Sequence, residues 1–227
     1  MPSVESIEVT TGASPVGSVI WLHGLGADGH DFEPIVPELR LPESMPLRFV
    51  FPHAPVRPVT VNGGMKMRAW YDIKSLDGEG RADEEGIRAS SAILDSLVER
   101  EIERGIASDK IVIAGFSQGG AIALHNAIRT AHSFAGLMAL SAYLPLPKLT
   151  ATEVTTKPAA GHTSLPIFMA HGTMDPMVPH AAGVQSRDAL VQLGYSVDWH
   201  EYPMAHSVCP QEIADIRQWL LDVYEAS

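Results

Sequence analysis

At positions 110–119 the chain reads Lys110-Ile-Val-Ile-Ala-Gly-Phe-Ser-Gln-Gly119. The first residues of this stretch are mostly β-branched or apolar and predict a buried strand, Lys110–Gly115. The residues that follow Ser117 predict a helix, Gln118–Arg129. Glycines two positions before and two positions after Ser117 remove Cβ atoms that would clash across a tight turn. The stretch therefore predicts a sharp strand-to-helix turn that holds the Ser117 hydroxyl outward.

Strand patterns alternate with helix patterns along the rest of the chain. The expected strands are Ser6–Thr10, Ser18–His23, Leu47–Pro52, Lys110–Gly115, Phe134–Ser141, Pro166–His171 and Ser196–Tyr202. The expected helices are Phe32–Leu39, Asp83–Arg104, Gln118–Arg129, Ala181–Leu193 and Gln211–Tyr224. This alternation predicts an α/β fold: a mostly parallel central sheet with helices on both faces, in a single domain over residues 1–227.

Two longer stretches, His53–Gly80 and Ala142–Leu165, carry no clear pattern and predict irregular loops. Long loops in a compact domain are usually functional or mobile. Neither stretch is long enough to form a helical lid domain. We therefore expect no separate lid domain and a site that is open to water.

The composition limits the partners and the compartment. The formal net charge of −11 disfavours nucleic acid and anionic membrane surfaces as partners. The single cysteine, Cys209, excludes an intrachain disulfide and suits a reducing compartment. The sequence has neither the pattern of a signal peptide at its first residues nor a run of 18 apolar residues, so we expect no stable membrane insertion. These features predict a soluble, cytoplasmic protein.

Serine is a poor nucleophile without a base, and the base needs a group that orients it. The expected strand Pro166–His171 leads into Asp175, and the expected strand Ser196–Tyr202 leads into His206. The carboxyl ends of parallel strands meet at one edge of a sheet, where ligands bind. The order Ser, Asp, His is also the order expected on such a sheet. The sequence therefore predicts a catalytic triad of Ser117, Asp175 and His206.

Other side chains are weaker candidates for these roles. Asp188 falls inside an expected helix, Asp198 and Glu201 fall inside an expected strand, and Asp175 could instead cap its turn. Among the histidines, five lie in expected helices or loops away from a strand end and His200 lies within a strand; the five are His53, His125, His132, His162 and His180. Neither the pair His23 and His30 nor the pair His200 and His206 has a third ligand at a suitable spacing, so no metal site is expected.

Two backbone N–H groups would have to stabilise the oxyanion of an acyl transfer reaction. Gln118, which directly follows the nucleophile, would supply one, and Leu25, in the glycine-rich turn after an early strand, would supply the other. That turn also contains Gly24-x-Gly26-x-x-Gly29, a dinucleotide-binding spacing. No acidic residue ends a second strand about twenty residues later, where a ribose ligand is expected. We therefore expect no cofactor.

Several motifs, in this order, resemble those of the phospholipase/carboxylesterase family, also called the acyl-protein thioesterase family. They are His23–Phe32, Phe51–Pro55, Gly115–Gly120, His171–Pro179 and Ala205–Ser207, and they span nearly the whole chain. Residues 57–64 and 67–72 resemble the bacterial carboxylesterase branch. The resemblance implies an α/β-hydrolase fold and the same triad and oxyanion donors, and it is compatible with a homodimer. It also implies an apolar substrate groove that includes Trp70, Leu76, Tyr143 and Met177.

Together these features predict a serine carboxylesterase that hydrolyses esters of short to medium acyl chains. One alternative is an acyl-protein thioesterase or a lysophospholipase that acts on long acyl chains. Another is a non-catalytic binding protein with a hydrolase fold. The groove also has an alternative interpretation, since Trp70 and Tyr71 could be ordinary loop packing and Met177 could be a gap-filling residue.

Overall fold

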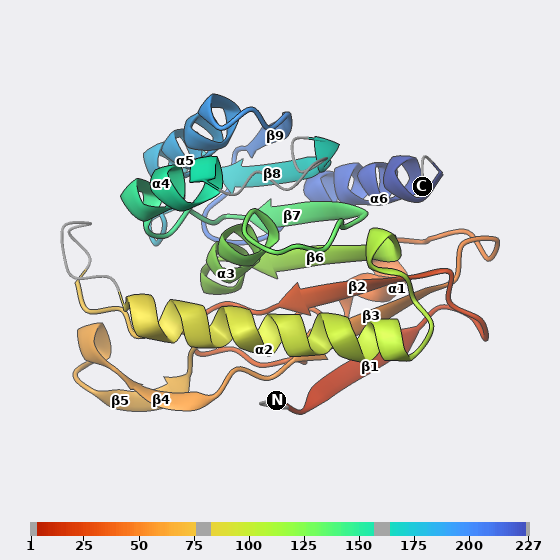
Figure 1. Cartoon of the computed structure of the whole chain (residues 1–227), viewed down its shortest axis with the longest axis horizontal. Helices are drawn as coiled ribbons and strands as arrows, with labels where there is room; N and C mark the ends of the chain where they lie inside the picture. Colours follow the sequence, from red (N-terminus) through yellow and green to blue (C-terminus); the bar gives the residue numbers. More distant parts are fainter. Residues whose placement is uncertain (1–3, 76–82, 157–163, 226–227) are drawn as a thin grey trace.

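The computed structural model describes residues 4–75, 83–156 and 164–225 of the 227-residue chain. Within these residues, seven strands form the central sheet in the order β1-β3-β2-β6-β7-β8-β9 (Figure 1). Their bounds are β1 Ser6–Thr10, β2 Gly17–Leu22, β3 Leu47–Pro52, β6 Ile111–Phe116, β7 Gly136–Leu140, β8 Ile167–Gly172 and β9 Val197–Tyr202. Only β1, at one edge, is antiparallel to its neighbour. The expectation of a mostly parallel sheet is confirmed.

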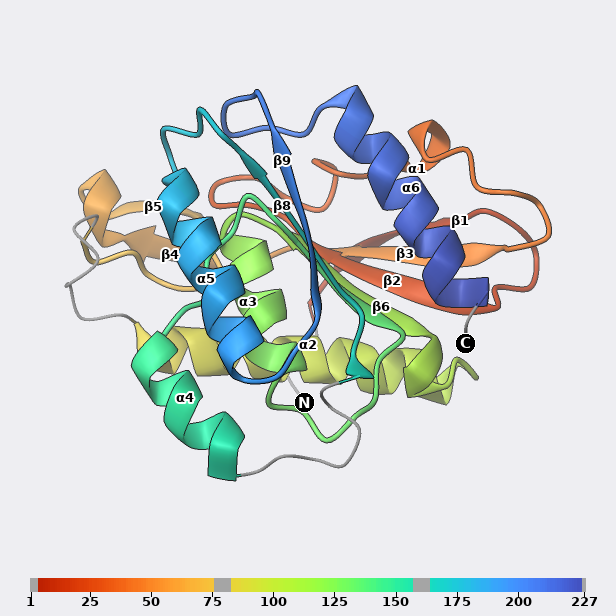
Figure 2. The same ribbon diagram turned by 90° about the horizontal axis from the view of Figure 1, so that it is seen from above.

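Helices cover both faces of this sheet (Figure 2). The helices are α1 Ile35–Glu38, α2 Glu84–Glu103, α3 Gln118–Ala127, α4 Pro147–Thr156, α5 His180–Gln192 and α6 Pro210–Glu225, with 3₁₀ turns at Thr60–Asn62 and Ser108–Lys110. Apolar residues of α2, α3 and α5 pack in one cluster with one face of the sheet. Apolar residues of α1 and α6 pack in another cluster with the opposite face.

The strands in the middle of the sheet are apolar at successive positions because both of their faces are covered. In β6, Ile111 and Ile113 pack toward α2 and α3, whereas Val112 and Ala114 pack toward α1 and α6. All six residues of β6 are buried. The continuous apolar run before Ser117 is therefore what anchors the turn at the end of this strand.

Two segments have more structure than the sequence patterns predict. The stretch expected to be irregular after residue 53 contains an antiparallel hairpin of β4 (Val56–Val59) and β5 (Met65–Arg68). The stretch expected to be irregular after residue 142 contains α4. Each strand of the hairpin is only four residues long, and β4 contains Pro58, so the strand pattern is too short to stand out.

The strand order brings distant loops together at one edge of the sheet. From β2 the chain moves outward to β3 and then crosses to β6, on the other side of β2. The loops that follow β2 and β6 are therefore neighbours, as expected at a topological switch point. The loops that follow β8 and β9 end at the same edge, because these strands are parallel to β6 and β7.

None of the helices in the described segments is both long enough and apolar enough to cross a membrane.

Candidate active site

Ser117 lies in a strained turn between β6 and α3. Its backbone angles, φ 53° and ψ −119°, fall in a region that residues other than glycine rarely adopt. Such strain costs about 1–3 kcal/mol and persists only where the surroundings impose it. The Ser117 N–H donates to the carbonyl of Leu140 at 2.9 Å, which ties the turn to the end of β7. Ser117 is partly exposed in this turn, which has the strand-to-helix arrangement of a nucleophile elbow.

The glycines around Ser117 are required by close packing. A Cβ on Gly119 would lie 2.3 Å from the carbonyl oxygen of Leu22, and a Cβ on Gly115 would lie 2.4 Å from the backbone of Gly119. Both distances are shorter than real Cβ contacts allow. The Gly-x-Ser-x-Gly pattern therefore has a steric basis in this fold, since it lets β2, β6 and α3 approach one another.

Asp175 and His206 come together from loops 31 positions apart in the sequence. Nδ1 of His206 donates to Oδ2 of Asp175 at 2.6 Å. The other carboxylate oxygen accepts the N–H groups of Met177 and Val178 at 2.8 and 2.9 Å. The Asp175 side chain is completely buried and that of His206 is 17% exposed. Since the carboxylate takes the Nδ1 proton, Nε2 of His206 is left as the ring nitrogen that can accept one.

His206 also packs against the residue that precedes Ser117. The ring centroids of Phe116 and His206 are 4.7 Å apart. The competing acidic residues have other partners: Asp198 pairs with His200 at 2.9 Å, and Glu201 pairs with His180 at 2.9 Å. Asp188 pairs with Arg187 on α5. The structure thus brings Asp175, and none of these three, to His206.

A second histidine, which sequence analysis did not single out, supports the acidic residue. Nε2 of His171 donates to the carbonyl of Val178 at 2.9 Å and lies 3.6 Å from Oδ2 of Asp175. Burial lowers the pKa of His171, so the ring is held in its neutral form. A Cβ on Gly183 would lie 2.4 Å from its Nδ1, so this side of the ring is tightly packed. His171 therefore fixes the turn that cradles Asp175; its position at the end of β8 was the available signal.

The two expected oxyanion donors have unused N–H groups. Within the described residues, the N–H groups of Leu25 and Gln118 donate to no protein acceptor. A Cβ on Gly24 would lie 3.5 Å from Cβ of Ser117, so the turn after β2 lies directly beside the elbow. Gln118 is the first residue of α3, where the helix dipole favours negative charge.

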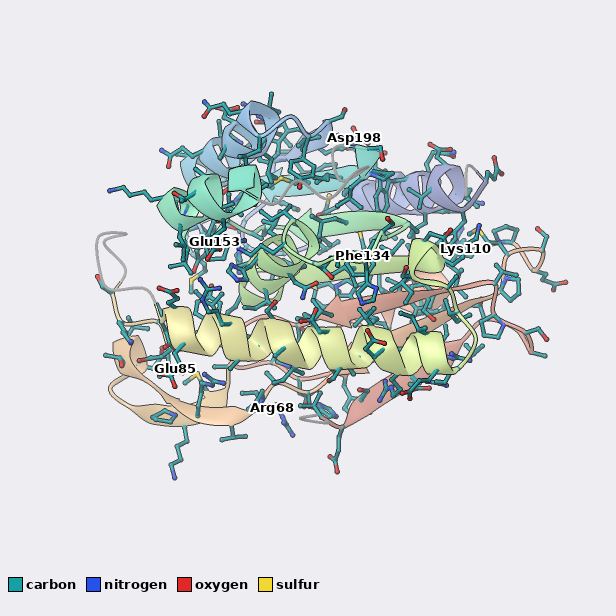
Figure 3. All side chains as sticks on the ribbon, in the orientation of Figure 1. Arg68, Glu85, Lys110, Phe134, Glu153 and Asp198 are labelled. Atoms are coloured by element: carbon teal, nitrogen blue, oxygen red, sulfur yellow. The ribbon has the colours of Figure 1, made fainter. Side chains whose placement is uncertain are left out.

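The turn after β2 is held in place by the hairpin. The N–H of Gly26, which has a φ of 78°, donates to the carbonyl of Arg68 at 2.9 Å. The Arg68 side chain, labelled in Figure 3, donates in turn to the carbonyl of Ala54 at 2.9 Å. The hairpin that sequence analysis missed therefore fixes one of the two candidate oxyanion donors.

The buried side chain of His23 holds the same turn through two hydrogen bonds. Its Nε2 accepts the N–H of Ala54 at 3.0 Å, so the ring proton is on Nδ1, which donates to the carbonyl of Gly24 at 2.7 Å. Burial is the main cause that lowers the pKa of His23 to about 4. The ring therefore stays neutral near pH 7 and keeps this donor–acceptor arrangement.

The structure places Trp70 differently from the expected groove wall. Its side chain is 0% exposed, and its indole N–H donates to the carbonyl of His23 at 2.9 Å. Its backbone N–H donates to Oε1 of Gln118 at 2.8 Å, and Nε2 of Gln118 donates to the carbonyl of Tyr71 at 2.8 Å. Trp70 is thus a core residue that holds both candidate oxyanion segments, because its polar groups find their partners beneath the site.

The other expected groove residues differ in accessibility. Met177 is 69% exposed beside Asp175, and Tyr143 is partly buried. Leu76 lies outside the described residues. Within the described part of the chain, no group of three or more His, Cys, Asp or Glu side chains could hold a metal ion.

Tyr143 lines a pocket of about 960 Å³ at this edge of the molecule. Segment 71–75, the start of α2, segment 143–149 and one face of α5 form its walls. None of Ser117, Asp175 and His206 lines it. The pocket adjoins the site through Tyr71, which lines the pocket and whose carbonyl accepts the Gln118 side chain.

The chain is similar to proteins of one known family. Residues 5–223 match the model of the family described as Phospholipase/Carboxylesterase. Acyl-protein thioesterase 1 of Neurospora crassa is 42% identical over 217 residues, which cover 92% of this chain and 88% of that protein. Acyl-protein thioesterase 1 of Cryptococcus neoformans is 36% identical over 238 residues, with 97% and 98% of the two chains covered.

A solved structure gives the same result for the fold. The crystal structure of Zea mays acyl-protein thioesterase 2 matches with a TM-score of 0.88 at 29% identity, over 97% of this chain and 99% of that chain. The family model spans almost the whole chain, and the relatives align over most of their lengths. The chain belongs to the phospholipase/carboxylesterase family and is a hydrolase of the serine-hydrolase class with an α/β-hydrolase fold.

Proposed function

We propose that this protein is an acyl thioesterase and esterase that acts on medium to long acyl chains through Ser117, His206 and Asp175. The observation that carries the proposal is the 2.6 Å hydrogen bond between His206 and Asp175, at the sheet edge where Ser117 is held in a strained turn. A nucleophile, a base and a buried group that orients the base are the parts that acyl transfer requires.

In this mechanism Nε2 of His206 takes the proton of Ser117 as Oγ attacks the acyl carbonyl. The carbonyl electron pair moves to oxygen, and the N–H groups of Leu25 and Gln118 stabilise the resulting oxyanion, at about 3 kcal/mol per donor. Asp175 stabilises the imidazolium that forms. His206 then protonates the departing thiolate or alkoxide, and water, activated by the same histidine, releases the acid from the acyl-enzyme.

The acyl chain would extend into the pocket lined by Tyr143. A volume of about 960 Å³ is at the upper end of ordinary ligand pockets, larger than a short acyl group needs. Each methylene that is buried there contributes about 0.8 kcal/mol. The relatives named acyl-protein thioesterases support the same preference, so acylated protein is the substrate class to test. The names of these relatives support a thioesterase better than a carboxylesterase that is restricted to short acyl chains.

The experiment combines active-site labelling with a substrate panel. A fluorophosphonate probe should label the wild-type protein at Ser117, and Ser117→Ala should lose both the label and all but a few per cent of hydrolysis. Ser207→Ala, which alters an exposed serine next to His206, is the matched control and should keep the label. kcat/KM for thioesters and oxygen esters of two to sixteen carbons should rise with acyl length and then level off.

Each result bears on a different part of the proposal. A wild-type protein that takes no label would favour the non-catalytic binding protein. Label retained in Ser117→Ala would identify another nucleophile. The third result concerns the substrate. If turnover were highest on acetate and butyrate oxygen esters and poor on every thioester, the protein would be a short-chain carboxylesterase.

A further inference from the structure

The pocket contains a pair of tyrosine hydroxyls in contact with each other. The hydroxyl oxygens of Tyr71 and Tyr143 are 2.6 Å apart, and both residues line the pocket. Tyr71 is 4% exposed, and burial raises the pKa of each phenol, so both remain protonated near pH 7. The pair comes from segments 72 positions apart, one before α2 and one after β7.

The two phenols have one O–H donor more than the hydrogen bond between them requires. Two phenols carry two O–H donors, and the contact between them consumes one. Within the described residues neither hydroxyl has a further hydrogen-bond partner. One O–H donor is therefore left over at the wall of the pocket.

The Ser186 hydroxyl, which also lines the pocket, has other hydrogen-bond partners and, among the described residues, makes no hydrogen bond with either phenol. Ser186 is buried on α5, where its hydroxyl donates to the carbonyl of Ala182 at 2.6 Å and accepts the N–H of Leu144 at 2.7 Å. Ile87 and Leu144 add apolar surface to the same wall. The spare donor thus lies on a partly apolar wall, where its partner must be water or a ligand.

We propose that this pocket selects acyl groups with an oxygen acceptor part-way along the chain, such as a hydroxyl or oxo group, and that Tyr71 and Tyr143 are the specificity-determining residues. The proposal rests on the proposed function for the placement of the acyl chain in the pocket. A plain alkyl chain that displaces water there leaves the O–H without an acceptor. A chain with an oxygen at the right position gives the O–H its acceptor and buries the same apolar surface. Sites that hydrogen-bond a substrate group discriminate in this way more strongly than apolar pockets do.

The test compares matched esters that differ by one oxygen. We would measure kcat/KM for p-nitrophenyl octanoate and decanoate and for their mono-hydroxy and mono-oxo derivatives, with the oxygen at successive carbons. The wild-type protein should favour one narrow range of positions by about tenfold, the size expected for one buried donor. A flat profile across all positions would overturn the proposal.

The variants are chosen by counting donors. Tyr71→Phe and Tyr143→Phe each leave one hydroxyl with one O–H, so each single variant should keep a preference, at a shifted position. The double variant Tyr71→Phe/Tyr143→Phe has no donor, and the ratio of oxygenated to plain esters should fall to about one. Tyr224→Phe removes a phenol that donates to the carbonyl of Ser18, at the opposite edge of the sheet, and should leave the ratio unchanged. A double variant with the wild-type ratio would show that the pair is not responsible.

A binding measurement separates this proposal from the proposed function. Calorimetry on Ser117→Ala protein would give the dissociation constants of octanoic acid and of the preferred hydroxyoctanoic acid, with no catalysis involved. Tighter binding of the hydroxy acid by about tenfold would support the selection even if no ester were hydrolysed, in which case only the proposed function would fail. Rapid hydrolysis with equal affinities for the two acids would overturn the selection and leave the proposed function intact.

Discussion

Trp70 is a buried residue whose hydrogen bonds reach both candidate oxyanion segments. Its indole N–H and its backbone N–H bind His23 and Gln118, one on each side of the candidate oxyanion site. Its carbonyl accepts the hydroxyl of Ser90 on α2, so the segment is tied to a long helix as well. With all three polar groups paired and the ring fully buried, Trp70 is a positioning residue.

Trp70→Phe should therefore lower kcat by a similar factor, about three- to tenfold, on acetate and octanoate esters, with little change in KM. Phenylalanine keeps an aromatic ring but lacks the N–H, so the carbonyl of His23 loses its donor and the turn that carries Leu25 loosens. Steady-state kinetics on both esters measures this. Trp219→Phe, on the opposite face of the sheet, is the control and should leave kcat unaltered. A loss confined to octanoate would instead show that Trp70 lines the acyl groove.

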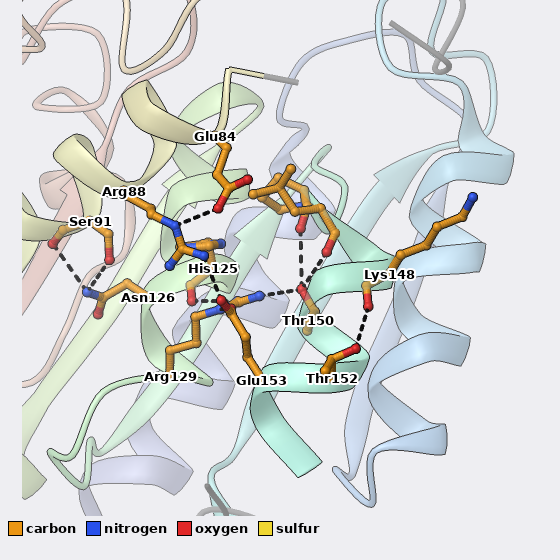
Figure 4. Close-up of polar contacts among 12 residues, drawn as sticks. Glu84, Arg88, Ser91, His125, Asn126, Arg129, Lys148, Thr150, Thr152 and Glu153 are labelled. Atoms are coloured by element: carbon orange, nitrogen blue, oxygen red, sulfur yellow. Dashed lines mark hydrogen bonds and ion pairs between the residues drawn. The ribbon is translucent and has the colours of Figure 1, made fainter. Parts of the chain in front are cut away.

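Helix α4 is held to the rest of the molecule by polar contacts. Figure 4 shows Glu153 between two arginines: its carboxylate is 2.6 Å from Arg88 of α2 and 2.7 Å from Arg129, which follows α3. Arg129 also donates to the hydroxyl of Thr150 at 2.5 Å and to the carbonyl of His125 at 3.0 Å. The first turn of this helix lines the pocket, so the ion pairs position one of the pocket walls.

Glu153→Gln should loosen α4 with little effect on global stability. The pair with Arg88, whose side chain is 44% exposed, is of a kind that contributes about 0–1 kcal/mol. Removing the shared carboxylate also takes this partner from Arg129, whose side chain is only 14% exposed. Amide hydrogen exchange in α4 should become several-fold faster, and KM for long acyl substrates should rise. Glu84→Gln is the matched control, because it removes the other partner of Arg88 within α2 and leaves α4 in place. Equal exchange rates in the two variants would exclude this role for Glu153.

Glu212 is a buried carboxyl group that the mechanism does not use. Glu212, in the first turn of α6, is 0% exposed on the face that α6 covers. Burial is the main cause that raises its pKa from 4.5 to about 8. Between these two pH values the folded protein holds one proton more than the unfolded chain. The associated stability is therefore fully present below pH 4.5 and is lost as the pH rises through about 8.

Glu212→Gln should remove this pH dependence. The amide has a similar shape and no charge to bury, so the free energy of unfolding at pH 8–9 should exceed that of the wild type by about 1–3 kcal/mol. At pH 5 the two proteins should differ much less. Urea unfolding at pH 5, 7 and 9 measures the difference. Glu225→Gln, exposed at the end of α6, is the control. A difference that is the same at all three pH values would mean that Glu212 does not titrate in this range.

Local patterns were enough to predict the sheet and the order of the candidate catalytic residues along it. The seven expected strands agree with the observed ones to within two residues at each end. Inner parallel strands such as β6 and β8 are recognisable because each is a continuous buried run, and Asp175 lies in the loop after β8. His206 follows β9, an edge strand with several polar residues, so its place rested on the order of the elements. The roles of Ser117, Asp175, His206, Leu25 and Gln118 stay predictions until the variants are measured.

The tertiary structure alone decided which side chains support the site. Trp70 was expected in a groove, but its partners His23 and Gln118 lie 47 and 48 positions away. The bond between the hairpin and the turn after β2, the contacts of α4 and the tyrosine pair likewise join segments that are distant along the chain. Periodicity reports which face of an element is buried, because that depends on neighbouring residues of the same element. It carries no record of which distant donor meets which acceptor, since that is settled only when the elements pack.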